Sequence, residues 1–497
     1  MRAMMWMSAA LVFAVACKKG EDKKQAEPPP KVVDKQKPEP VKPAPLADVP
    51  VTSKSPEAIK ELERGLAMAD NQRAPEAVEH LKKAVELDPE FAQAICYLGT
   101  FTPGAEGTDL LTKAGTLTAK LPEAEQSLIS GMQAGRAGDR PKMLGAYEKT
   151  VQLAPGAWRV HLTLAAIANG ERDNTKALSH LEQALKIKPD LAQAYNLTAY
   201  VKASQREWEP AIAAAKKQVE LLPKEPNPRD TLGEILLWSG KFDESEKEFT
   251  AAVTMEPKFT LAWQGVALAR AYRNDFKGAY EAVDKRKTST APGEKQEALV
   301  DRAWLAIAED KLPQALAALD EIEKDPAAKK LPVYAFAALN RAHILVAGGK
   351  YPEATKQFAT ALSRGDVLAG DGKAELARGH RFGVLRLAAL TGKPAADADK
   401  VVAAVEDDQK QQGDPQRGPQ FVAYAKGLAA WAKKDLKTAI AEMSKCDPEL
   451  LYCRYDLALA QRKSGDKAGA EATEKQIRET PRREAAAVYL MTHLPKP

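Results

Sequence analysis

The sequence contains few of the residues from which enzyme active sites and metal centres are built. Its 497 residues include only six histidines and four cysteines, and the histidines are too dispersed for an HExxH motif or another closely spaced ligand set. Phosphate-binding GxxxxGK[ST] loops, GxGxxG loops and GxSxG nucleophile elbows are also missing. These absences predict a protein that is not an enzyme and that uses neither a cofactor nor a metal.

Aromatic residues are scarce and charge is nearly balanced. Aromatics make up only 6% of the chain, while alanine, leucine, lysine and glutamate recur throughout, which favours helices over β-sheets. The net charge is +5, but Arg2 supplies one positive charge, and residues 18–55 hold nine lysines against six acidic residues. Subtracting these leaves about +1 for the rest of the chain, too little for the basic surface of a nucleic-acid-binding protein.

Long apolar runs are absent after the amino terminus. Residues 1–17 read MRAMMWMSAALVFAVAC, in which one cation precedes about a dozen apolar residues, a pattern typical of an export signal. This run is shorter than the roughly 20 residues that a membrane-spanning helix needs. Its end, Ala14-Val15-Ala16-Cys17, resembles the lipobox of bacterial lipoproteins. That resemblance implies a lipid on Cys17 and an exported protein anchored to the cell envelope, with the periplasmic side of the outer membrane preferred. Ordinary secretory cleavage after a small-x-small sequence is the alternative.

Residues 18–55 are rich in proline and lysine and contain few large apolar side chains. Such a composition cannot bury enough surface to fold, and we expect a disordered spacer between the membrane and a folded body.

A repeat begins near residue 56. Each copy begins with a small residue. A second small residue, usually alanine, follows twelve positions later, a large apolar residue four positions after that, an alanine three positions further and a proline five positions further still. One copy consists of Ala165, Ala177, Leu181, Ala184 and Pro189. The small residues that open successive copies stand 34 positions apart: Gly131, Ala165, Ala199, Gly233 and Ala267.

This pattern resembles the tetratricopeptide repeat, a 34-residue helix-turn-helix unit with small residues where its two helices cross. The resemblance implies an all-α, right-handed superhelical solenoid of about a dozen hairpins. We expect regular repeats over 56–291, divergent repeats over 292–480 and a polar capping segment over 481–497, because the last repeat of a solenoid needs a polar outer face.

In tetratricopeptide arrays the first helix of each repeat lines a concave groove. The resemblance therefore places nine side chains in such a groove: Arg159, Asn169, Asn196, Tyr200, Asp230, Glu234, Trp238, Gln264 and Tyr272. Tyr200, Trp238 and Tyr272 come from consecutive hairpins, and aromatic side chains beside amides and charges suit an extended peptide. The alternative is that these rings only cover the seams between helices.

Cys446 and Cys453 lie close in sequence across a predicted turn, and an exported protein can form disulfides. They are either bonded or two small packing residues, and the sequence leaves both possibilities open. Together these features predict a membrane-tethered scaffold that binds a partner protein or peptide for envelope assembly, secretion or motility. A cell-wall or glycan-binding regulator of a peptidoglycan enzyme is the alternative.

Overall fold

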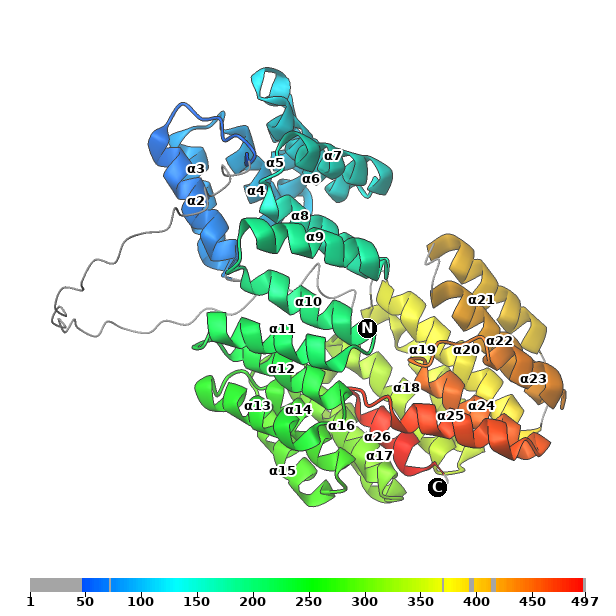
Figure 1. Ribbon diagram of the computed structural model, residues 1–497. Helices are drawn as coiled ribbons and strands as arrows, with labels where there is room; N and C mark the ends of the chain where they lie inside the picture. Colours follow the sequence, from blue (N-terminus) through cyan, green and yellow to red (C-terminus); the bar gives the residue numbers. More distant parts are fainter. Residues whose placement is uncertain (1–46, 71–72, 369–370, 393–396, 413–416, 495–497) are drawn as a thin grey trace, which may run out of the picture. The chain divides into compact units, whose positions relative to one another are not determined.

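The computed structural model describes residues 47–70, 73–368, 371–392, 397–412 and 417–494 (Figure 1). Throughout these residues the regular structure is helical, with 25 α-helices, three short 3₁₀ segments and no strand. The predicted all-α repeat fold is confirmed. The chain divides into two compact units, residues 1–201 and 202–497, so the division falls inside one helix, Ala192–Ser204.

Unit 1 is built from helices that pack as consecutive antiparallel pairs, the first of which is α2 with α3 (Figure 1). A 3₁₀ turn, Thr118–Lys120, precedes the third pair. The helices of unit 1 are α2 (Pro56–Asp70), α3 (Ala74–Leu87), α4 (Ala92–Phe101), α5 (Gly104–Thr116), α6 (Glu123–Ala137), α7 (Arg140–Leu153), α8 (Trp158–Gly170) and α9 (Asn174–Ile187), followed by α10 (Ala192–Ser204), which crosses the division.

Unit 2 continues with paired helices but becomes irregular near residue 371, where the long helix α20 packs on α22 as well as on α21. Short 3₁₀ segments at Ala328–Lys330 and Gly365–Val367 accompany the change. The helices of unit 2 are α11 (Trp208–Leu221), α12 (Pro226–Trp238), α13 (Phe242–Met255), α14 (Ala262–Tyr272), α15 (Phe276–Arg286), α16 (Glu294–Ala308), α17 (Leu312–Lys324), α18 (Pro332–Ala347), α19 (Tyr351–Ser363), α20 (Asp371–Thr391), α21 (Ala398–Gln412), α22 (Arg417–Ala432), α23 (Leu436–Met443), α24 (Leu451–Ser464), α25 (Lys467–Arg478) and α26 (Ala485–Thr492).

The small residues at 34-residue spacing are all buried where the helices of a hairpin cross. Close approach of two helices requires such small side chains. At the α12–α13 crossing the Ser245 hydroxyl donates a hydrogen bond of 2.7 Å to the Gly233 carbonyl. Phe249, fully buried, lies against Gly233 and Gly265, and a Cβ atom added at Gly265 would come within 2.4 Å of its ring.

The turns inside the hairpins share a backbone conformation. Most of the turns that the structure describes contain one residue with a positive φ, and five of these residues follow one another at 34-residue intervals: Gly138, Arg172, Arg206, Gly240 and Asn274. Only glycine adopts this left-handed conformation without steric cost. In several turns the next residue is an aspartate whose carboxylate accepts a hydrogen bond from the first turn of the second helix, as at Asp139 and Asp173.

Two predictions about the amino-terminal region have different outcomes. The export signal and Cys17 lie outside the described residues and stay predictions, as does most of the spacer. Residues 47–55, however, are not disordered, because they run along the amino-terminal ends of α4, α6 and α8. The Ser53 hydroxyl and Lys54 amide donate to Asp88 at 2.6 and 2.9 Å, and the Gly156 amide donates to the Ala47 carbonyl at 2.6 Å. Among the helices described, none is both long and apolar enough to cross a bilayer.

Candidate functional site

The nine predicted groove positions lie on first helices of their hairpins, four in unit 1 and five in unit 2. In unit 1, Arg159 forms an ion pair of 2.7 Å with Asp70 and stacks 4.1 Å above the ring of Trp158. Asn196 is buried, whereas Asn169 and Tyr200 are partly exposed. The positions are distributed as follows: Arg159 and Asn169 on α8, Asn196 and Tyr200 on α10, Asp230, Glu234 and Trp238 on α12, and Gln264 and Tyr272 on α14.

In unit 2 the predicted positions contact the chain's own carboxy-terminal region. Residues 479–484, which we call the tail segment, have no helical structure and connect α25 to α26. Four of the five predicted positions, Asp230, Glu234, Trp238 and Tyr272, interact with Arg482 or Arg483 of the tail segment. Together with Phe249 we call these four residues the tail site. The fifth, Gln264, instead donates to Asp301 of α16 at 2.9 Å.

Arg483 is the most deeply held residue of the tail segment. Its side chain is 3% exposed, and its two terminal nitrogens donate to the two carboxylate oxygens of Asp230 at 2.8 and 2.7 Å. One of these nitrogens also donates to the Leu261 carbonyl at 3.1 Å, and Glu234 contributes a second negative charge at 3.9 Å. This paired geometry is the form of arginine–carboxylate contact that gives the greatest specificity, and lysine cannot reproduce it.

The ring of Phe249 supports the same guanidinium group. The centre of the Arg483 guanidinium lies 4.7 Å from the ring centroid, a distance at which the face of an aromatic ring attracts a cation. Phe249 belongs to α13 and packs against α12 and α14 where Gly233 and Gly265 lack side chains. The repeat's small crossing residues therefore also shape the binding site.

Tyr272 holds the backbone of the tail segment. Its hydroxyl donates to the Arg482 carbonyl at 2.8 Å and accepts from the Arg482 amide at 2.9 Å. Burial raises the pKa of Tyr272 above its usual value, so the phenol stays protonated and remains a donor. Because both bonds involve the main chain, this contact recognises an extended backbone rather than a particular side chain.

Two further contacts align the tail segment. Arg206, in the turn before α11, donates to the Thr480 hydroxyl at 2.8 Å. The Arg482 side chain pairs with Glu449 at 2.8 Å and lies 5.9 Å from the ring of Trp238. Side chains from several hairpins thus position residues 480–483 of the tail segment.

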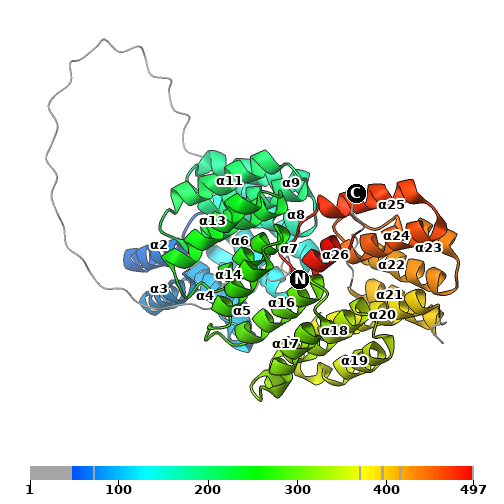
Figure 2. The same cartoon turned by 90° about the horizontal axis from the view of Figure 1, so that it is seen from below.

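The helix that follows the tail segment is apolar, contrary to the expected polar capping segment. The sequence of α26 is AAAVYLMT, and most of its residues are buried. It packs chiefly on α16, as Figure 2 shows, with the ring of Tyr489 5.9 Å from that of Trp304. The helix anchors the tail segment from its carboxy-terminal side.

Sequence reasoning missed Arg482 and Arg483. Their signal is the pair of arginines after Thr480-Pro481, which ends the helical pattern but precedes a short apolar run. That run, Ala485 to Met491, is too short to show which surface it covers.

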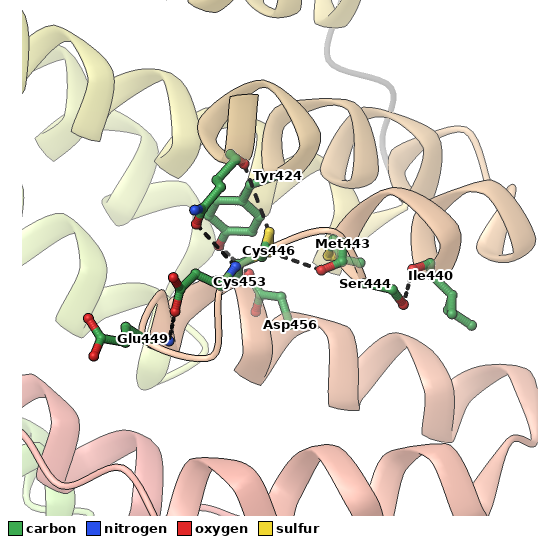
Figure 3. The surroundings of a disulfide bond; sticks show 10 residues. Tyr424, Ile440, Met443, Ser444, Cys446, Glu449, Cys453 and Asp456 are labelled. Atoms are coloured by element: carbon green, nitrogen blue, oxygen red, sulfur yellow. Dashed lines mark hydrogen bonds between the residues drawn. A yellow bond between two sulfur atoms is a disulfide. The ribbon is translucent and has the colours of Figure 1, made fainter. Parts of the chain in front are cut away.

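Cys446 and Cys453 form a disulfide between the end of α23 and the start of α24 (Figure 3). The short loop that it closes carries Glu449, the partner of Arg482. Figure 3 also shows Tyr424 and Asp456 beside it. Asp456 is fully buried, accepts from Tyr424 at 2.6 Å and pairs with buried Arg386 at 2.9 Å. This network ties α20, α22 and α24 together.

The histidines give no sign of a metal centre. His161 and His180 approach to 3.1 Å between their Nδ1 atoms across the α8–α9 hairpin. Burial is the main cause that lowers the pKa of both, which favours neutral, packed side chains. In the part of the chain that the structure describes, no group of three or more histidine, cysteine or acidic residues could hold a metal ion.

Among known proteins, the similarities found are to solved structures with low sequence identity. No family model and no curated sequence matches the chain. Yeast Tom70 is similar over 85% of this chain and 96% of its own length, with 16% identity and a TM-score of 0.44. A tetratricopeptide repeat protein from Parabacteroides merdae covers 66% of this chain and 99% of its own length, with 16% identity and a TM-score of 0.34. PilW, described as a type IV pilus biogenesis factor, covers 42% and 97%, with 17% identity and a TM-score of 0.35.

Proposed function

We propose that this protein is a non-catalytic scaffold, tethered to the cell envelope by a lipid on Cys17, whose helical repeats bind an extended segment of a partner protein. Envelope assembly, secretion and motility are the processes in which such a scaffold would act. The observation that carries the proposal is the tail segment, because side chains predicted to face a groove hold a non-helical stretch of polypeptide in unit 2.

The chemistry of these contacts supports a protein partner. Two hydrogen bonds to one backbone unit, a paired arginine–carboxylate contact and aromatic rings are the elements by which grooves select extended peptides. The partly exposed Asn169 and Tyr200 stand at predicted groove positions in unit 1 and provide candidate partner contacts there.

Site-specific photocross-linking tests partner binding. A benzophenone amino acid replaces Asn169 on the first helix of the α8–α9 hairpin, and the matched control replaces exposed Glu182 on the second helix. In cells we expect a discrete protein adduct from position 169 and not from position 182. Equal labelling from both positions would contradict binding on the first-helix face, and co-sedimentation with purified peptidoglycan without any protein adduct would favour the glycan-binding alternative.

Membrane fractionation tests the tether. Cys17→Ser should move the protein from the membrane fraction to the soluble periplasmic fraction, because a lipidated cysteine is the proposed attachment point. A chain that sediments with membranes equally well after this substitution would contradict the lipid anchor and leave peptide binding unaffected.

A further inference from the structure

We infer that the tail site of unit 2 is a recognition site for an extended segment with two consecutive arginines, and that residues 479–484 occupy it as an internal ligand which a partner of the same chemistry displaces. This inference rests on the proposed function, since it specifies the partner segment that one part of the repeat array would bind.

The side chains of the site specify most strictly the second of the two arginines, at the position that Arg483 occupies. Asp230 and Glu234 stand one helical turn apart on α12, and both are buried although both are acidic. Buried carboxylates need a positive partner, and the guanidinium of Arg483 supplies it with two hydrogen bonds. The Phe249 face beneath it excludes water and favours a flat cation.

The neighbouring position is specified less strictly. Arg482 lies between Glu449 and Trp238, where its side chain is 20% exposed. The Tyr272 hydroxyl bonds both the carbonyl and the amide of Arg482, so both groups must point to the same side, as they do in an extended backbone. The ligand is therefore an extended peptide with a strictly required arginine and a preferred arginine before it.

The contacts of the tail segment favour a replaceable occupant over a permanent core element. Its contacts with the tail site are mainly polar and cation–aromatic, Pro481 is its one buried apolar residue, and most of the apolar burial at this end of the chain lies in α26. A partner could replace residues 479–484 while α25 and α26 stay packed. The tail segment has the advantage of being tethered, at an effective concentration of about 1 mM for a short connection.

This advantage gives the inference a measurable consequence. If a free peptide with the same contacts binds an open site with a Kd of about 10 µM, competition from the tethered segment weakens that binding about 100-fold in the unaltered chain. Removing the two arginines from the tail should therefore strengthen binding of an external peptide.

The test uses a fluorescent peptide with residues 478–487, RETPRREAAA, and the chain without its export signal. We expect the Arg482→Ala, Arg483→Ala double variant to bind this peptide at least about tenfold more tightly than the unaltered chain in fluorescence anisotropy. Adding Asp230→Asn to the double variant should abolish the gain, and a peptide with lysines at both arginine positions should bind at least about tenfold more weakly.

Folding of each variant is checked by far-ultraviolet circular dichroism, and Arg483→Lys replaces the double variant if the latter aggregates. Absence of peptide binding by a folded variant would overturn the inference and show the tail segment to be a fixed brace. Binding that does not depend on Asp230 would overturn it as well, and so would dimerisation of the unaltered chain through exchanged tails, measured by light scattering. None of these outcomes affects cross-linking at position 169, so the proposed function is tested separately.

Discussion

Gly265→Ala should destabilise the crossing of α13 and α14 even though alanine is the better helix former. A Cβ atom at this position would lie 2.4 to 2.5 Å from three atoms of the Phe249 ring, far inside van der Waals contact. Phe249 has 0% exposure, so its ring can move only by displacing other buried atoms. Overpacking at such short distances should cost about 2–3 kcal/mol, the upper part of its usual range, and the gain in helix propensity of about 1 kcal/mol offsets only part of it.

The expected net loss of about 1–2 kcal/mol can be compared with two other glycines. Gly233 touches the same ring, but its added Cβ would lie 2.9 to 3.0 Å away, so Gly233→Ala should cost less. Gly145 in α7 is exposed and has no neighbour within 4 Å of an added Cβ atom, so Gly145→Ala should stabilise its helix by about 0.5–1 kcal/mol.

Amide hydrogen exchange measured by mass spectrometry is the appropriate assay, because hairpins of a repeat protein can open separately and a single melting temperature would average them. Exchange in α12 to α14 should become about five- to thirtyfold faster in Gly265→Ala, following tenfold for each 1.4 kcal/mol. Phe249→Leu should reduce the effect of Gly265→Ala. If Gly265→Ala exchanged as slowly as the unaltered chain, the glycine would not be required for packing of the ring.

The remaining predictions concern the protonation of a buried histidine, a buried ion pair and the disulfide. His343 lies against the rings of Phe358 and Tyr452, and burial lowers its pKa from 6.5 to about 3. Because the unfolded chain binds this proton more strongly, the free energy of unfolding should fall as the pH drops below about 6.5, by about 2 kcal/mol at pH 5. His343→Leu should flatten this pH dependence in urea titrations at several pH values. Asp456→Ala leaves buried Arg386 without its carboxylate and should cost about 3–5 kcal/mol in thermal or urea unfolding. Thiol titration of the denatured, unreduced chain from residue 47 onward should find one thiol, Cys96, and three after reduction.

The helical hairpins could be predicted from sequence because the determining residues recur locally. A small residue every 34 positions marks a helix crossing whatever the rest of the chain does, and Gly131, Ala165 and Ala199 are all buried. The pattern weakens where α20 extends over 21 residues and packs on α22, since a longer helix no longer keeps the 34-residue register.

The predicted groove positions of unit 2 were placed through family resemblance, but their occupant could not be predicted. Asp230 and Arg483 are 253 residues apart, and nothing in the local sequence of either one indicates the other. The apolar α26 was missed for a related reason, since eight residues do not show a periodicity that identifies their buried face. Contacts between distant segments follow from the folded structure as a whole.

The residue at the positive-φ position of each turn can make one hairpin more or less stable than the next. Arg172, Asn274, Asp310 and Lys434 carry side chains at φ values of 58° to 68°, where glycine stands in other hairpins. Each such side chain costs about 1 kcal/mol relative to glycine, less for asparagine and aspartate. The stability of successive hairpins therefore depends on one backbone position in each turn. Arg206 at such a position also donates to Thr480 of the tail segment, whereas the other turn positions are not part of the tail site. Selection can soften or strengthen one segment of the array while its recognition chemistry stays the same.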